Sequence, residues 1–488
     1  VILGGLVVMQ NGMSSPTKIG TVKAMSKKMK WLAIGGSMVF AIVLFTLLGL
    51  SEQAARGQAL EEARAKIRQA GFALDADGFR KVLGNTATGE DAWPVYSEAI
   101  RTYFPRAVDE NPESEGDETI RDTLLSVSEG IRYWRRGNRN WDFTFGRSDA
   151  DVRLQGLLET VSRAANMGRI VPDREWETGH LVALPEVMEL AKLGRLLVYD
   201  GIRAFETNDN GRLRQRLQDL AAMANQVWRV PLIPYQMLGL SIAHDAMALV
   251  KTLVCVYDID HQSATEFFKA VGPVLAMPDL KASFGGLVYN GMATLNLLNS
   301  PERMKQAELE ARVIRRNPPR PELRQQIELD FLQAANRILA RWPKDPEDVE
   351  GIRKALDKDD AKMNLSLGLF SRFMRQTVGN DPDEGLFERS LEPFESHLAR
   401  VRLFKVLIAA HAARIQKGRF PAELPLTGQD AIDPFSGEAF RYITDFDGTG
   451  FRAYSFGPDR EDNEGSRPRT EGGSLDIVML CPDRRIGW

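Results

Sequence analysis

The sequence predicts a mainly α-helical protein with a small C-terminal α+β module. Three observations support this fold class. The segment 31–50 contains 20 consecutive uncharged residues. From residue 51 to about 395, apolar residues recur at helical rather than two-residue spacing. From about residue 396 the pattern changes to one apolar helix followed by short β-rich runs.

Length and composition bound the remaining possibilities. With 488 residues, the chain exceeds a single typical core, so several domains are expected. The formal net charge of −3 gives no indication of a nucleic-acid partner, and none is expected. The two cysteines, Cys255 and Cys481, exclude a disulfide framework and a cysteine-rich zinc module. One disulfide between them stays open, although Cys255 lies in an apolar run that favours a buried thiol.

The uncharged segment 31–50 is predicted to be a transmembrane helix. As a helix it spans about 30 Å, which matches the hydrocarbon core of a bilayer. Four lysines stand between positions 23 and 30, whereas glutamates predominate just after the segment. The positive-inside rule therefore places residues 1–30 in the cytoplasm and the rest outside. A cleaved signal peptide is the alternative, but its apolar region is usually shorter, about 7–15 residues.

This topology predicts a single-pass protein of a bacterial inner membrane that contacts lipid through residues 31–50. The bulk of the chain is then periplasmic or otherwise extracytoplasmic. Residues 1–24 are featureless, and the run MSKKMK from Met25 has the character of a natural beginning. We interpret the first 24 residues as an upstream extension.

The segment 51–395 is predicted to be an extracytoplasmic domain of helical hairpins. Residues 51–70 are rich in Ala, Glu, Arg and Gln, which favours a helix that continues from the membrane. Leucines at 190, 193 and 197 mark one helix face, and leucines at 213, 217 and 220 mark the next. The sequence ETNDNG at 206–211 supplies turn chemistry between them. This stretch therefore predicts two antiparallel helices.

Four short motifs follow one another in residues 396–488. A helix ends in KGRFP, and DPFSGEAFRY, YSFGPD with an acidic loop, and DI come after it. In this order they resemble the globular part of the type II secretion major pseudopilin. The resemblance covers less than a fifth of the chain, and it implies one helix packed on a small antiparallel sheet. The whole layout also resembles uncharacterised single-span bacterial envelope proteins.

The resemblance also implies a calcium site in the acidic loop. Its ligands are the backbone carbonyl of Phe456 and the side chains of Asp459, Asp462 and Asp476. Independently of the family, calcium takes six to eight oxygen ligands, and four acidic residues between positions 459 and 464 offer several. The alternative is a solvated acidic turn that nearby arginines neutralise.

One departure from the pseudopilin pattern concerns assembly. The residues before the apolar segment read KMKWLAIGG. They lack the Gly-Phe junction and the early Glu of a prepilin-peptidase site. Assembly into a pilus-like fibre through the N-terminal helix is therefore not expected.

Three further patterns resemble functional motifs but favour other interpretations. GLSIA at 239–243, followed by His244, resembles a nucleophile elbow but lies in a helical run. DFDGTGFRAYSF at 445–456 matches the start of an EF-hand loop but ends on Phe instead of Glu, so a hairpin turn is expected. His397 and His411 share one predicted helix face but stand about 21 Å apart, too far to bind one metal. No catalytic residue is assigned.

These observations favour a non-catalytic, membrane-anchored envelope protein that binds or scaffolds a protein partner. An accessory part of a type II secretion or pilus-like machine is one alternative, suggested by the C-terminal module alone. A periplasmic hydrolase whose site combines residues distant in sequence is another. A deep pocket with clustered acidic or histidine side chains would favour the hydrolase.

Overall fold

The structure is a computed structural model. It describes residues 51–85, 88–103, 131, 134, 148–173, 176, 185–298, 321–368, 387–465 and 476–481. The chain forms two compact units, Val1–Gln58 and Ala59–Trp488. The predicted cytoplasmic segment 1–30 and the predicted transmembrane helix 31–50 lie outside the described residues. Residues 51–69 are helical, as the composition of this segment predicts.

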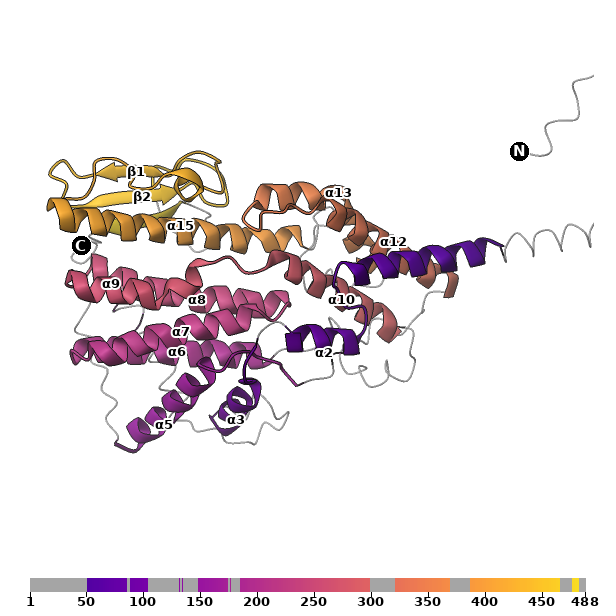
Figure 1. Ribbon diagram of the computed structural model, residues 1–488, viewed down its shortest axis with the longest axis horizontal. Helices are drawn as coiled ribbons and strands as arrows, with labels where there is room; N and C mark the ends of the chain where they lie inside the picture. The colour runs from indigo at the N-terminus through magenta and orange to yellow at the C-terminus, as the bar shows by residue number, and fades with distance from the viewer. Residues whose placement is uncertain are drawn as a thin grey trace, which may run out of the picture. The chain divides into compact units, whose positions relative to one another are not determined.

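The predicted fold class is confirmed in its coarse form, since the described residues of the second unit are mainly helical with one small antiparallel sheet (Figure 1). Its helices are α2 (Ala76–Asn85), α3 (Trp93–Tyr103), α5 (Ser148–Ala165), α6 (Pro185–Glu206), α7 (Asn210–Trp228), α8 (Ile233–Cys255), α9 (His261–Ala270), α10 (Leu280–Leu298), α12 (Pro321–Arg341), α13 (Val349–Gly368) and α15 (Glu388–Lys417). Short 3-10 helices among the described residues include η3 (Gly272–Leu275) and η6 (Gly428–Ala431). The strands are β1 (Arg441–Thr444), β2 (Phe451–Ser455) and β3 (Ile477–Cys481).

Helices α6 and α7 form the hairpin that the leucine pattern predicts. All six of those leucines are fully buried. Asp209 caps α7 by accepting a hydrogen bond from the backbone N–H of Arg212 at 2.9 Å. Asn208, with φ of 55°, adopts the left-handed conformation that the turn requires, which Asn tolerates better than most residues. The ETNDNG turn therefore ends one helix and begins the next.

Helix α8 lies in the core of the second unit. Among the described residues, it is the one helix with the length and hydropathy of a membrane span, but 72% of its most apolar window is buried within the protein. Ser241 of the GLSIA motif lies inside this helix, which confirms the helical interpretation. Helix α10 passes close to the α7–α8 connection, because a Cβ on Gly286 would stand 1.4 Å from the carbonyl oxygen of Pro231. Only glycine permits this approach.

The three strands form an antiparallel sheet in the order β1-β2-β3. Tyr442 pairs with Ala453 across β1 and β2, and Phe451 pairs with Cys481 across β2 and β3. Residues 445–450 connect β1 to β2, so the EF-hand-like sequence contains a hairpin turn, as expected. Cys255 and Cys481 are both buried free thiols, and the open possibility of a disulfide between them is not realised.

Helix α15 connects the helical part to the sheet. It contacts α8 on one side and β2 and β3 on the other, so it lies between the two (Figure 1). The sequence places the start of the C-terminal module at residue 396, but the helix begins at Glu388 and crosses that position without a break. Leu391 and Phe394 are fully buried and continue the apolar face across it. Gly418, with φ of 70°, ends the helix in the left-handed conformation.

Candidate functional site

The predicted calcium ligands lie in and around the loop after β2. Asp459 accepts hydrogen bonds from the backbone N–H of Glu461 and from the side-chain amide of Asn463, both at 3.2 Å. Asp462 accepts from the hydroxyl of Tyr454 at 3.2 Å and from the backbone N–H of Glu464 at 2.9 Å. These contacts are typical of short-range turns in which Asp side chains cap backbone N–H groups.

Asp476 closes this loop from the far side in sequence. Its carboxylate accepts the backbone N–H of Gly465 at 2.6 Å and that of Asn463 at 3.4 Å. Burial is the main cause that raises the pKa of Asp476, and the charges of Asp462 and Asp459 raise it further. Asp459 and Asp462 are therefore near enough to Asp476 to disfavour its charge.

The described geometry is that of a hydrogen-bonded turn, not of a finished metal cage. Within the part of the chain that the structure describes, no three His, Cys, Asp or Glu side chains converge so that they could hold a metal ion. The backbone N–H of Phe456 donates to Asp433 at 3.1 Å. Phe456 is thus held by a residue outside the predicted ligand set. Calcium binding in this loop therefore stays a prediction.

Asp433 organises the C-terminal module, although no sequence pattern pointed to it as a functional residue. It is 1% exposed, and it accepts hydrogen bonds from Ser455 Oγ at 2.6 Å and from Ser436 Oγ at 3.0 Å. With the backbone N–H groups of Phe435 and Phe456, it has four donors. A buried carboxylate with this many donors is stabilised in its place. Asp433 belongs to the DPFSG motif, and this motif is the sequence signal that could have identified it.

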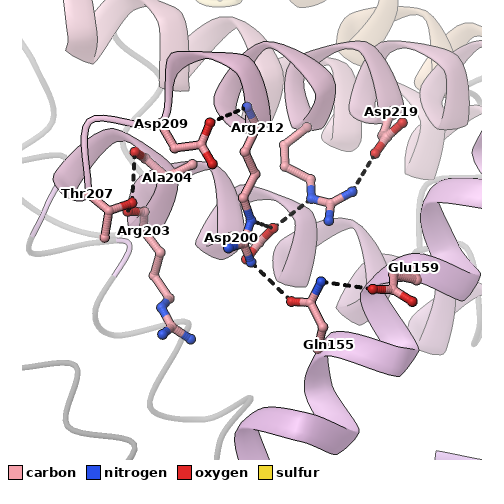
Figure 2. Close-up of polar contacts among 10 residues, drawn as sticks. Gln155, Glu159, Asp200, Arg203, Ala204, Thr207, Asp209, Arg212 and Asp219 are labelled. Atoms are coloured by element: carbon pink, nitrogen blue, oxygen red, sulfur yellow. Dashed lines mark hydrogen bonds and ion pairs between the residues drawn. The ribbon is translucent and has the colours of Figure 1, made fainter.

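A second polar cluster is buried between α6 and α7 (Figure 2). Asp200 of α6 has 1% side-chain exposure and accepts both Nε and Nη2 of Arg212, a bidentate pair. Nε of Arg216 also donates to Asp200 at 2.7 Å, and Nη1 of Arg216 donates to Asp219 at 2.9 Å. Asp219 is fully buried and receives further bonds from Gln215 and Asn166 at 2.9 and 3.0 Å.

Each charge in this cluster has an opposite charge or several donors, so the cluster holds helices together rather than presenting a reactive group. We call Asp200, Arg212, Arg216 and Asp219 the α6–α7 charge cluster. Burial and then the charge of Asp219 raise the pKa of Tyr96, so its hydroxyl stays protonated. The sequence did not indicate this cluster, because alternating arginines in the run GRLRQRLQD are typical of an exposed helix face.

Two pairs of histidines lie where α15 meets its neighbours. Nε2 of His244 on α8 stands 3.1 Å from Nδ1 of His397 on α15. The rings of His261 on α9 and His411 on α15 have centroids 6.2 Å apart. His397 and His411 thus have different partners. Neither pair is evident in the sequence, because each joins residues about 150 positions apart.

The fold and these clusters define a class of protein: a mainly helical unit that carries a three-stranded antiparallel sheet on one long helix. Comparisons with protein-family models, with curated proteins and with solved structures found no match to this chain.

Proposed function

We propose that this protein is a membrane-anchored envelope scaffold that binds a protein partner through the outer edge of its C-terminal sheet. The observation that carries this proposal is an apolar surface at β1. Ile443 is 46% exposed, and Phe446, in the turn that follows, is fully exposed. Among the described strands, β1 pairs with β2 alone. A free strand edge beside exposed apolar side chains is suited to an added strand of a partner.

The cross-linking test compares two positions. A photoreactive residue at position 446 is expected to give a discrete adduct in intact membranes, and the same residue at Lys354, an exposed position on α13, is expected to give none. Adding Ile443→Asp should abolish the adduct from position 446 while leaving the melting temperature unchanged, because Ile443 is already half exposed. Equal labelling from positions 446 and 354 would contradict binding at this edge.

The anchor in this proposal is the segment 31–50, which has the length and lysine asymmetry of a single span. Protease added outside spheroplasts is expected to digest the chain after residue 50 and to leave a small membrane-protected fragment. The control is the same digestion after the membrane has been permeabilised. Protection of residues 396–488 in intact spheroplasts would reverse the orientation and contradict the envelope location.

Calcium remains a proposed ligand of the acidic loop. If free calcium reaches about 100 times its dissociation constant, linkage stabilises the folded state by roughly 2.7 kcal/mol. The melting temperature of the full chain is therefore expected to rise with calcium and to fall with a chelator. Asp476→Asn should remove this difference, whereas Glu464→Gln should retain it. An equal melting temperature with calcium and with chelator would contradict calcium binding and support a hydrogen-bonded turn without a metal.

A further inference from the structure

The contact surface of α15 with α8 and α9 concentrates titratable groups. Four of the five histidines in the sequence lie there, as the pair His244 and His397 and the pair His261 and His411. We call this surface the α15 seam. It holds the helix that carries the sheet, so any change in its charge acts on the connection between the sheet and the helical part.

The inner pair forms a directed hydrogen-bond chain. Nη1 of Arg400 lies 3.4 Å from Nδ1 of His244. A guanidinium only donates, so in the neutral pair we assign the acceptor of His244 to Nδ1 and its proton to Nε2, which then donates to Nδ1 of His397. The proton of His397 is then on Nε2. Both rings are therefore neutral, and each accepts at one nitrogen.

Burial disfavours a charge on this pair. His397 is fully buried, and its ring meets the edge of Trp228 at a centroid distance of 5.8 Å. Burial lowers the pKa of His397 to about 4, with a further lowering by Arg400 and an opposing contribution from the backbone of Ala276. Burial, then Arg400 and His397, hold the pKa of His244 well below its ordinary value.

Protonation is also disfavoured at the outer pair. His411 is 5% exposed, and neither of its ring nitrogens has a hydrogen-bond partner. Burial lowers the pKa of His411, and the charges of Arg414 and His261 lower it further. Asp258 raises it, but this carboxylate is exposed and already pairs with Arg414 at 3.0 Å.

The charged groups around the seam therefore offer little compensation for new positive charge. Helix α15 contributes Arg400 and Arg414, helix α9 contributes His261, and the α8–α9 connection contributes Asp258. Helix α7 contributes the neutral ring of Trp228, and the chain after η3 contributes the Ala276 backbone. Asp258 is the carboxylate that favours protonation of one of these rings, that of His411.

We propose that the α15 seam is an acid-sensitive latch. Protonation of His244, His397 and His411 places new positive charges beside two arginines in a packed interface. Like charges at this distance repel, and a buried charge without a partner is costly. Acid therefore loosens α15, together with the sheet packed on its other side, from α8 and α9. The inference stands independently of the proposed anchor and partner.

The direction of the pH effect follows from the folded and unfolded proton affinities. The released state takes up protons near the ordinary histidine pKa of 6.5, whereas packed His397 does so only near 4. Packing is therefore fully stable above about pH 6.5 and weakens progressively as the pH falls toward 4. For His397 alone, the opening equilibrium should rise about 30-fold between pH 7.5 and pH 5.

Hydrogen exchange of the full chain tests the latch. Protection factors of α15, corrected for the intrinsic pH dependence of exchange, are expected to fall at least about 30-fold from pH 7.5 to pH 5. The double variant His244→Gln/His397→Asn retains one donor and one acceptor at the two positions but cannot titrate. The protection factors of α15 in this variant should fall by a much smaller ratio. His261→Gln, at an exposed position, leaves the inner pair intact and should lose nearly as much protection as the unaltered protein.

Two outcomes would overturn the proposal. One is an unchanged protection of α15 at pH 5 in the unaltered protein. The other is an equal loss in the double variant, which would assign the effect to other groups. If the double variant does not fold at pH 7.5, urea unfolding of the unaltered protein replaces this comparison. A urea midpoint that is as high at pH 5 as at pH 7.5 would contradict the latch.

Discussion

Truncation after residue 395 is expected to abolish cooperative unfolding of the helical part, whereas truncation after residue 417 should preserve it. The first cut removes most of α15, although residues 51–395 were expected from the sequence to form a separate domain. The helix crosses that position and covers α8. The first truncation would remove six large, buried apolar side chains of α15: Leu398, Val401, Leu403, Phe404, Val406 and Leu407.

The expected loss is large compared with the stability of an ordinary domain. Burying one such side chain contributes about 1.5–3 kcal/mol, so six contribute roughly 9–18 kcal/mol. Whole domains are stable by only about 5–15 kcal/mol. The chain ending at 417 retains these side chains and should melt cooperatively, at a lower temperature than the full protein because the sheet is missing.

Circular dichroism during heating distinguishes the two chains. The chain ending at 417 should show a sigmoidal loss of helix, and the chain ending at 395 should show a broad, non-cooperative one. A sharp transition of equal midpoint in both would show that the helical part does not need α15. That result would support the boundary that the sequence places at 395.

Arg216→Met is expected to destabilise the protein by about 3–5 kcal/mol. Arg216 has 7% side-chain exposure and bridges Asp200 and Asp219. Its removal leaves Asp219 buried without a cation, and breaking one partner of a buried ion pair typically costs this much. The free-energy cost at Asp200 is smaller, because Asp200 keeps the bidentate contact with Arg212.

Matched variants separate the loss of charge pairing from the loss of an arginine. Arg214→Met, on the same helix, removes a surface pair with Glu266 in which the side chains are 49% and 39% exposed, so it should cost less than about 1 kcal/mol. Adding Asp219→Asn to Arg216→Met should recover part of the loss, because it removes the uncompensated charge. Urea unfolding measures all three. A similar cost for Arg216→Met and Arg214→Met would contradict the role of the cluster.

The helices and the hairpins follow from local sequence patterns. The leucine periodicity of α6 and α7 and the ETNDNG turn predict two antiparallel helices, because each helix must bury its apolar face against a neighbour. The Gly/Asp turn between β1 and β2 predicts a β-hairpin for a similar reason, since short-range turn chemistry determines the pairing of adjacent strands. Periodicity and turn chemistry are properties of a few consecutive residues, so they can be recognised in the sequence without a structure.

The tertiary structure alone decided which distant residues meet. Arg216 lies in a sequence typical of a solvated helix face, and only the packing of α6 on α7 turns it toward Asp200 and Asp219. His244 and His397 are separated by 153 positions and become neighbours because α15 lies on α8. Hydrophobic patterns are non-directional and identify which faces are buried, not which partner covers them. For this reason the sequence by itself determined the elements and their buried faces, whereas the charge cluster, the α15 seam and the continuity of α15 across residue 395 required the fold.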